Sequence, residues 1–570
     1  MDILKVKNKK CKKDNLILIL AMLALSFLFI IPCLKTHTIY NADDMPYHIN
    51  RIQELVYSLR HGNWYPYMYT NQFKEVPYPL GIFYPQITLI PIAVLCIIFN
   101  NYVIGIYAGF SLYTFISMII MYVIARRLGK REATAFIISI VYTFSTYRLL
   151  DAYSRFALGE FLAMTFVPMA IYGLYIVMKD GKGWQWLGMG LSFTLLSHVL
   201  SALLCVLFLT IEFILLLPYC GNWKQSARSL IIAIISFLLS SIIFIAPFLE
   251  QEVYQRFRQP SPLDLATTNS ILSDLISNSL NNNIIGPSTG TRPGTIGIVL
   301  FVVMIWGMIN VRKSNLMNKY ILYAGVLTFI LATNIFPWSI MMHTPLKVIQ
   351  FPFRILVFTT LLLSFTAGQM FESFYNVITS NKISRVTFVG ASIIIVVFPW
   401  YSSFKSYQHA KANDANFTEN VSYAKGTWAT NWYLDQYTPA KAMDKYQQLF
   451  YLKAKVDNKT VQLRKITGKV NEMEYRDTSL MNKKTVTLPA SVYKNVQIWQ
   501  SKKRLSHNKN GLVTIHNTKV GTIKYKYVPS NVDNISRYIS ILTWLGVIFW
   551  SCITGTVDVR WKRKEFKIGN

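Results

Sequence analysis

The sequence predicts a polytopic α-helical membrane protein of about twelve transmembrane helices, with a small external domain of mainly β structure near the C-terminus. Of its 570 residues, 52% are hydrophobic and 15% are charged, and the mean hydropathy is +0.32. The apolar residues form repeated blocks of about 16 to 24 residues almost free of charge, and 102–125 is a clear example. A helix of roughly 20 such residues crosses about 30 Å of hydrocarbon.

Twelve of these blocks are interpreted as membrane spans. The first follows a basic N-terminus, but it is long and lacks a small-residue cleavage site, so it is interpreted as a retained helix rather than a signal peptide. The predicted spans are 15–34, 102–125, 133–149, 157–178, 184–198, 200–218, 228–247, 294–311, 319–336, 353–371, 385–401 and 536–556.

A further apolar stretch, 81–99, decides the orientation of the chain. Pro85 and Pro91 interrupt it, which favours an interfacial or re-entrant segment over a thirteenth crossing. Eighteen Lys and Arg then lie in the inner turns and tail, against seven in the outer short loops, with Arg148 counted among the seven. The positive-inside rule prefers this solution and predicts that both termini are cytoplasmic.

This topology divides the chain into three parts. Residues 1–401 form the transmembrane domain, and 35–101 is its first external loop, which we expect along the membrane surface. Residues 402–534 form an external domain, and 535–570 contain the last helix and a basic cytoplasmic tail. The runs VTLP, VQIW, GLVTIHN and GTIKYKYVP, separated by Asn, Lys and Gly turns, predict a small β-sandwich in the external domain.

The net charge of +31 does not indicate nucleic-acid binding. The cations lie at the ends of apolar blocks or within 402–534, which contains 22 Lys and Arg. A basic domain beside a membrane fits anionic lipid heads or wall polymers. None of the six cysteines lies in 402–534, and the sequence has no zinc spacing, Walker loop or dinucleotide fingerprint. Nucleotide-driven transport is therefore not predicted.

The first cluster of candidate site residues begins the first external loop. From Asp44 the sequence predicts an amphipathic helix, with Asp44, His48 and Arg51 on one face. Asp43 or Asp44 could instead simply cap this helix, with Pro46 in its first turn. The opposite face is apolar and suited to lie on lipid, and it comprises Ile49, Ile52, Leu55, Val56 and Leu59.

Two more groups are predicted at the same outer surface. Asp151, Arg155 and Glu160 lie within ten residues at a span boundary, where they form either a paired site or ordinary anchors. His198 lies at a tight external turn, where a structural role is the alternative. The loop 337–354 adds cations that could hold a lipid phosphate or reach ordinary headgroups, namely His343, Lys347 and Arg354.

Several of these motifs carry a resemblance to a known family. Asp44-x-x-x-His48 with Arg51, then GNWYP and GIFYP, is similar to the first external loop of YfhO-like bacterial membrane proteins. DAYSRFALGEFLA, LLSHVLSA, QFPFRIL and the stretch from LPASVYKNVQIW to KYKYVPS extend the resemblance over nearly the whole chain. These proteins are related to the family called 6-pyruvoyl-tetrahydropterin synthase-related membrane proteins, and they resemble GT-C glycosyltransferases.

The resemblance implies sugar transfer at the outer face of a bacterial cytoplasmic membrane, from a polyprenyl-phosphate donor to an envelope polymer or lipid. Asp44, or alternatively Asp43, would be the general base. Asp151 and Glu160 would orient the acceptor or share a divalent metal. The first loop has the adjacent acids Asp43 and Asp44 rather than a spaced Asp-x-Asp pair, so the use of a metal stays open. His48 and His198 would orient groups or ligate metal. The phosphate leaving group would have its charge offset by Arg155, Lys347 and Arg354, and the other predicted substrate-binding residues are Arg51 and His343.

Two other functions remain open at this stage. A flippase or carrier for lipid-linked precursors would need polar residues at the middle of the membrane, where Glu212 is an exception in otherwise uncharged spans. A non-enzymatic envelope scaffold would use the basic domain to hold anionic polymer.

Overall fold

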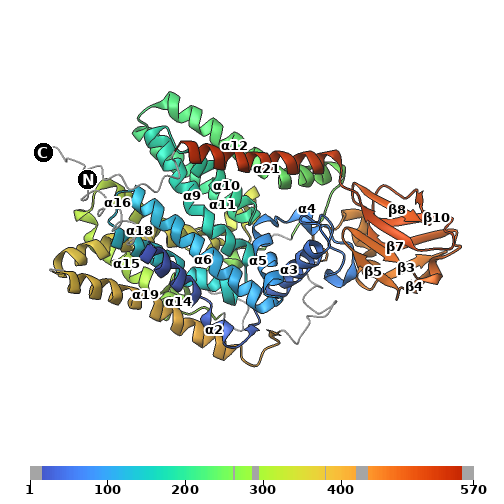
Figure 1. The fold of residues 1–570 in the computed structure, drawn as a ribbon, viewed down its shortest axis with the longest axis horizontal. Coiled ribbons are helices and arrows are strands. Elements are labelled where there is room, and N and C mark those ends of the chain that lie inside the picture. The colour runs from blue at the N-terminus through green and yellow to red at the C-terminus, as the bar shows by residue number, and fades with distance from the viewer. Residues whose placement is uncertain (1–15, 261–262, 286–293, 379–380, 419–433, 555–570) are drawn as a thin grey trace, which may run out of the picture.

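The computed structural model describes residues 16–260, 263–285, 294–378, 381–418 and 434–554. Long helices form a bundle at one end of the molecule, and two β-sheets lie at the other end (Figure 1). The helices of the first external loop, α3 (Met45–Arg60) and α4 (Leu80–Phe83), lie between these two parts.

Seven helices among the described residues are long and apolar enough to cross a membrane, or eight if one bent pair is a single span. They are α6 (Tyr102–Arg127), α9 (Leu158–Asp180), α11 with its last turn (Val199–Tyr219), α12 (Trp223–Tyr254), α18 with its first turn (Pro352–Ile378), α19 (Lys382–Ala410) and α21 (Asn531–Ile553). The bent pair joins α7 (Glu132–Thr143) to Thr146–Ser154 at 41°. These helices support a polytopic membrane protein.

The remaining predicted spans correspond to shorter helices. These are Leu16–Leu28, α10 (Trp184–Leu195), α15 (Gly297–Asn310) and α16 (Leu316–Leu331). All twelve predicted blocks therefore overlap a helix, but the count of twelve crossings stays a prediction. Short helices in the connections are α2 (Ile31–Leu34), α8 (Thr146–Leu149), α13 (Leu265–Thr268), α14 (Leu272–Leu280), α17 (Trp338–Met341) and α20 (Tyr446–Phe450).

Glycines allow a close contact between the helices α9 and α10. A Cβ atom at Gly173 would lie 2.2 Å from the Leu187 backbone nitrogen, and one at Gly190 would lie 2.4 Å from that of Ala170. Small residues at such crossings let two backbones approach and are typical of helix pairs in membranes.

The stretch 81–99 is too short as a helix to cross a membrane. After α4 the chain breaks, and the apolar helix that follows covers Ile87–Ile98, with α5 itself at Ile90–Ile98. Twelve residues rise about 18 Å, well short of roughly 30 Å of hydrocarbon. The chain then returns along α6, where a Cβ atom at Gly105 would lie 2.4 Å from the Cα atom of Cys96. This geometry supports the predicted re-entrant segment.

Contacts between the predicted inner turns place them at one end of the bundle. Lys130 and Glu372 form an ion pair at 3.3 Å, joining the α6–α7 turn to the end of α18. The Arg127 guanidinium lies 5.3 Å from the Trp186 ring centroid, and Ser229 Oγ donates to the Gly181 carbonyl at 2.7 Å. The basic tail predicted at the same side falls in 555–570, outside the described residues.

The interpretation of Arg148 as an outer-loop cation is wrong. Its side chain is fully buried in α8, where Nη1 donates to Thr114 Oγ1 at 3.0 Å and the guanidinium lies 4.2 Å from the Phe161 ring centroid. The helix continues past the predicted span end at residue 149 and carries this arginine inside the bundle. Its removal from the outer loops strengthens the charge asymmetry.

The lipid-facing role predicted for α3 is also wrong. Ile49, Ile52, Leu55 and Val56 are at most 2% exposed and belong to the main protein core. The re-entrant helix α5 packs against α3 and takes the place that lipid was expected to occupy. A helix has the same pattern of apolar residues whether its apolar face packs on protein or on lipid, so the sequence pattern alone does not distinguish the two environments.

The β-rich region is an antiparallel β-sandwich. One sheet has the order β10-β7-β3-β4 and the other the order β5-β6-β11-β8-β9, and residues of both share one core. The strands are β3 (Lys453–Val456), β4 (Lys459–Gln462), β5 (Ile466–Lys469), β6 (Glu472–Tyr475), β7 (Thr485–Ser491), β8 (Val496–Gln500), β9 (Lys503–Leu505), β10 (Leu512–His516) and β11 (Ile523–Tyr527). A separate pair joins β1 (Thr38–Ile39) to β2 (Phe417–Thr418).

The four predicted β-runs are confirmed as β7, β8, β10 and β11. The stretch predicted as the start of the external domain, from residue 402, begins within α19, which continues to Ala410. Its first half is part helix and part turn, and 419–433 lie outside the described residues.

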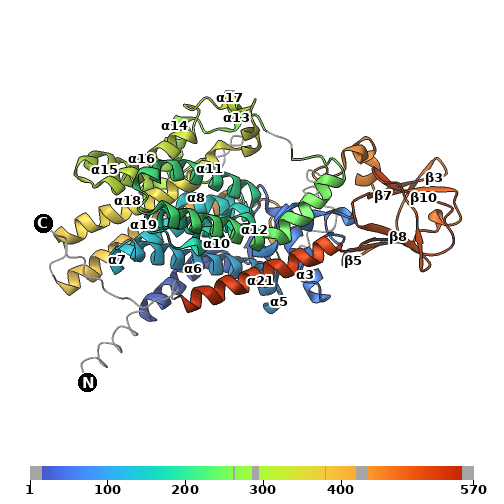
Figure 2. The ribbon, with the colours of Figure 1, turned by 90° about the horizontal axis from the view of Figure 1, so that it is seen from above.

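The sandwich is attached to the membrane part through the first loop and two long helices. Asn471 Oδ1 accepts hydrogen bonds from the Tyr67 and Met68 backbone nitrogens, both at 2.9 Å. Figure 2 shows α12 and α21 extending from the bundle toward the sheets, and Gln251 of α12 exchanges two hydrogen bonds with the Lys494 backbone at 3.0 and 3.1 Å.

Glu54 of α3 fixes the connecting part of the first loop. Its buried carboxylate accepts hydrogen bonds from the backbone nitrogens of Thr70, Asn71 and Gln72, each at 3.0 Å. Charge-assisted bonds of this kind hold a loop more firmly than neutral ones. The loop, in turn, donates from Thr70 Oγ1 to the Lys469 carbonyl of β5.

Candidate active site

A cluster of charged and polar side chains lies at the end of the bundle opposite the basic turns. Glu160 is in the first turn of α9, whose other end, at Asp180, meets those turns. The cluster draws on α3, the break after α4, the α8–α9 connection, the α10–α11 turn and the start of α18. Five segments distant in sequence therefore supply one site.

Arg155 joins the two acids of the second predicted group. Its Nη1 lies 2.5 Å from Asp151 Oδ1 and 3.0 Å from Glu160 Oε2, and all three side chains are at most 3% exposed. Arg354 Nε approaches Glu160 at 3.4 Å, and the Tyr147 hydroxyl donates to Glu160 Oε1 at 2.5 Å. Two carboxylates thus face two guanidinium groups, so the predicted pairing is a buried network rather than a set of surface anchors.

This donor set does not fit a divalent metal. The oxygen atoms of Asp151 and Glu160 that face the network are paired with guanidinium groups, which repel a cation. Among the described residues, no group of three His, Cys, Asp or Glu has the arrangement of a metal site. In the described structure, Asp151 and Glu160 therefore share an arginine, Arg155, and not the predicted metal site.

An irregular connection brings the network together. After α8 the chain forms one π-helical turn at Leu150–Ser154, and Phe156 then adopts a left-handed backbone with φ of 50°. A bulky residue in this region stores strain, which often marks a functional connection. The carbonyl of Arg155 accepts a hydrogen bond from the Asp44 backbone nitrogen at 2.9 Å, so the same turn positions the first loop.

Asp44 lies beside the cluster, and Asp43 does not. Asp44 is the residue before α3 and is half-buried, but its side chain makes no capping hydrogen bond to the helix. Its carboxylate is within electrostatic range of Arg155 and Arg354. Asp43 is exposed, and its carboxylate lies within electrostatic range of Tyr407. The capping alternative is therefore wrong for the Asp44 side chain.

Arg51, on the predicted polar face of α3, extends the site toward the break after α4. Its Nη1 lies 3.3 Å from His48 Nδ1, its Nη2 donates to the Pro85 carbonyl at 2.5 Å, and its guanidinium lies 4.1 Å from the Tyr84 ring centroid. All of these side chains except the half-buried Tyr84 are buried. Sequence reasoning did not select Tyr84, although it stands in the GIFYP motif.

His198 joins the cluster from the α10–α11 turn. It caps α11 by accepting a hydrogen bond from the Ser201 backbone nitrogen on Nδ1 at 3.3 Å, which confirms the structural alternative for this ring nitrogen. A Cβ atom at Gly159 would lie 2.7 Å from the Tyr84 hydroxyl oxygen and 3.1 Å from His198 Cδ2. Glycine at 159 therefore lets α9 approach both rings.

The loop 337–354 contributes only one of its three predicted residues. Arg354 is buried in the network, whereas His343 and Lys347 are exposed and make no recorded contact with the cluster in the described part of the chain. The prediction that His343 and Lys347 bind substrate with this cluster is not supported. Lys347 lies in the short helix Pro345–Ile349, and the chain is buried again from Pro352 to Arg354.

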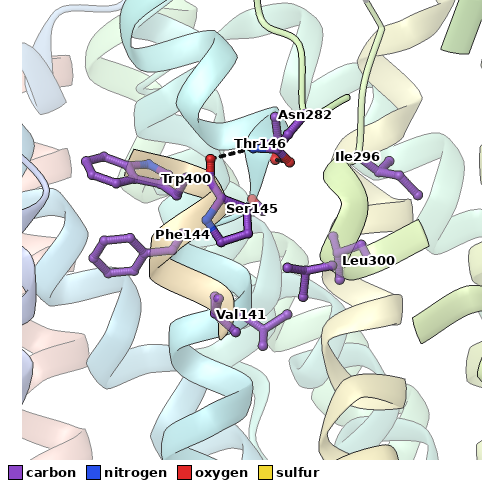
Figure 3. Close-up of a pocket in the computed structure, with 11 residues that line it drawn as sticks. Val141, Phe144, Ser145, Thr146, Asn282, Ile296, Leu300 and Trp400 are labelled. Atoms are coloured by element: carbon purple, nitrogen blue, oxygen red, sulfur yellow. Dashed lines mark hydrogen bonds between the residues drawn. The ribbon is translucent and has the colours of Figure 1, made fainter. Parts of the chain in front are cut away.

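Two small cavities lie away from the charged cluster. One of about 10 Å³ lies between α7, α15 and α19, where Thr146 Oγ1 donates to Asn282 Oδ1 at 2.7 Å beside Trp400 (Figure 3). Another of about 60 Å³ lies around Glu212, and its other lining residues are apolar or tyrosine. Neither includes a residue of the cluster.

The environment of His48 predicts an acid-sensitive stability. Burial, followed by the neighbouring Arg51 and His198, lowers the pKa of His48 well below its ordinary value of 6.5. The unfolded chain then binds a proton that the folded protein does not, so stability falls as pH drops below about 6.5, by up to about 1.4 kcal/mol per pH unit. Thermal unfolding of His48→Asn between about pH 7 and pH 5 should show a smaller acid loss than the wild type.

His343→Asn is the matched control, because it changes an exposed histidine away from the cluster. An acid loss that is the same in wild type and His48→Asn would contradict a neutral, buried His48.

Comparison with known proteins gives one structural likeness. No protein-family model matches the chain, and no curated protein matches it. Among solved structures, it is similar to the cryo-EM structure of arabinofuranosyltransferase AftD from Mycobacteria, with 12% sequence identity and a TM-score of 0.39. The match covers 90% of this chain and 40% of that one, so the chain spans less than half the length of that protein.

The fold and the cluster together define a polytopic membrane protein with a buried arginine–carboxylate centre at one end of its bundle. A β-sandwich adjoins the same end.

Proposed function

We propose that the chain is a membrane glycosyltransferase of GT-C type. It transfers a sugar from a polyprenyl-phosphate donor to an envelope polymer or lipid at the outer face of a bacterial cytoplasmic membrane. The observation that carries the proposal is the position of half-buried Asp44, whose backbone nitrogen donates to the Arg155 carbonyl at 2.9 Å and whose carboxylate lies within electrostatic range of Arg155 and Arg354. A carboxylate beside fixed cations is what proton removal and a phosphate leaving group require.

The proposed step is a single displacement. Asp44 takes the proton of an acceptor hydroxyl while that oxygen bonds to the anomeric carbon of the donor sugar. The bond between the anomeric carbon and the phosphate oxygen breaks, and the polyprenyl phosphate leaves with the electron pair. Arg51 and Arg354 offset the charge that develops on the phosphate.

The remaining residues of the cluster hold this arrangement. Glu160 anchors Arg155 and Arg354, and Arg155 fixes the backbone of Asp44. His48 contacts Arg51, and the Tyr84 ring lies beneath the Arg51 guanidinium. Preorganised charges cost no rearrangement during the reaction, which is why rigid burial favours catalysis.

The carrier alternative has less support. A carrier binds its cargo near the middle of the membrane, whereas the buried network of Asp151, Arg155 and Glu160 lies at one end of this bundle.

Glycan analysis of cells with and without this protein tests the proposal. We expect one sugar substituent of an envelope polymer or lipid to disappear on deletion and to return when the wild-type chain is expressed. An unchanged glycan profile would overturn the proposal. Purified protein that moves labelled lipid-linked sugar across liposomes without forming a transfer product would establish the carrier instead.

A further inference from the structure

The outer face of the five-stranded sheet carries charged side chains around one half-buried tryptophan. Lys524 of β11 is directly opposite Trp499 of β8 and Glu474 of β6. Side chains directly opposite each other in antiparallel strands project to the same side of the sheet. The alternate positions face the sandwich core, and they are Met473, Ile498 and Tyr525.

Positive charge dominates this face. The Glu474 carboxylate is shared by Lys469 at 2.7 Å, Arg476 at 2.5 Å and Lys524 at 3.0 Å, and these three basic side chains are 42–52% exposed. Arg504 on the edge strand β9 is exposed and directly opposite Trp499. Glu472 on the same face pairs with Lys524 at 3.2 Å and with Lys526 at 3.8 Å. Two carboxylates, of Glu472 and Glu474, thus face five cations, which are Lys469, Arg476, Arg504, Lys524 and Lys526. Excess cations therefore remain after internal pairing.

Trp499 gives the face an aromatic surface with polar neighbours. Its Nε1 donates to Gln497 Oε1 at 3.2 Å, and Gln497 is directly opposite Lys526 on the next strand. A tryptophan ring combines a flat apolar surface with a polar edge. The C–H face of a sugar ring can stack on it while hydroxyl groups bond the amide and anionic groups pair with lysine and arginine.

The same region lacks the apolar anchors that membrane insertion uses. From 446 to 527, where every residue is described, Tyr451 and Val520 are the large apolar side chains with strong exposure. Surfaces that lie in a bilayer interface bury a broad apolar face. The composition of this face favours a soluble polyanion over a lipid surface.

We propose that this basic sheet face binds a polyanionic glycan, a polymer whose sugar units carry phosphate, sulfate or carboxylate groups. The face consists of Lys469, Gln497, Trp499, Arg504, Lys524 and Lys526. Sugar stacking on Trp499 supplies recognition of the ring, and the cations supply attraction to the charged groups. Binding requires no sugar donor, so this inference stands or fails separately from the proposed function.

Binding of the purified full chain to three commercial polymers tests the inference. Dextran sulfate offers sugar and charge, dextran offers sugar alone, and polyphosphate offers charge alone. We expect dextran sulfate to bind most tightly and its binding to weaken as salt rises. Trp499→Ala should weaken dextran sulfate binding about tenfold and leave polyphosphate binding unchanged, while Lys524→Gln should weaken both.

Matched controls remove the same groups elsewhere in the sandwich. Tyr451→Ala removes an exposed aromatic ring outside the basic sheet face, and Lys459→Gln removes an exposed lysine on β4 of the other sheet. Lys524→Gln leaves Glu474 with two basic partners, so folding should persist. Trp499→Phe, which keeps a ring, should retain most of the binding that Trp499→Ala loses.

Dextran sulfate binding that is equal in wild type, Trp499→Ala and Lys524→Gln would overturn the inference. So would tighter binding to phosphatidylglycerol vesicles than to dextran sulfate, which would assign the face to a lipid surface.

Discussion

Asp44→Asn is expected to lower sugar transfer about 10²- to 10⁴-fold, the usual contribution of a general base. The amide has nearly the same shape but takes no proton from an acceptor hydroxyl. The Asp44 side chain makes no capping hydrogen bond to α3, so the variant should reach the membrane in normal amount. The measurement is the envelope glycan profile of deletion cells that express the variant, alongside its level in membranes.

Asp43→Asn is the control, because it makes the same chemical change one residue earlier at an exposed position. Transfer should persist in this variant. If Asp43→Asn loses transfer and Asp44→Asn keeps it, the assignment of the base moves to Asp43, and if both keep it, neither acid is the base.

Arg155→Met is expected to destabilise the protein by about 3–5 kcal/mol, because it leaves the buried Asp151 and Glu160 without their shared partner. Unfolding can be followed on heating by the reaction of the buried thiols of Cys33 and Cys205 with a fluorescent maleimide. The variant should react at a clearly lower temperature than the wild type.

Two further variants test whether the loss of stability arises because buried carboxylates are left without their partner. Arg258→Met removes a half-exposed arginine that pairs with Asp435 at 3.3 Å, and it should cost about 1 kcal/mol or less. Adding Asp151→Asn to Arg155→Met removes one unpaired charge and should recover part of the stability. An Arg155→Met variant as stable as Arg258→Met would contradict the buried network.

Patterns with a strong local signal predicted much of the fold. The apolar blocks located the helices because a lipid environment demands long uncharged runs. The alternating residues of VQIW and GTIKYKYVP located β8 and β11 because successive side chains on a strand face opposite sides. The proximity of Asp44, Arg155 and Glu160 agreed with the expectation that the outer loops meet at one surface.

What failed depends on contacts between distant segments. Arg148 looks like a loop cation in sequence, and only packing against Thr114 and Phe161 reveals that it is internal. Tyr84 resembles the many tyrosines at membrane interfaces, and its role follows only from its stacking with Arg51. His343 and Lys347 share a loop with Arg354, but residue type alone does not tell which of the three cations is buried.

The hydrogen bonds from the backbone of residues 70–72 to Glu54 have a consequence for where a long polymer would receive sugars. The helix that begins beside Asp44 is joined through this carboxylate to β5, one strand of the sheet that carries Trp499. The separation between Asp44 and Trp499 is therefore set by folded structure along this link. If a polymer binds at Trp499 while it reacts beside Asp44, the fixed distance between these two places would cause sugars to be added at a regular spacing along the polymer.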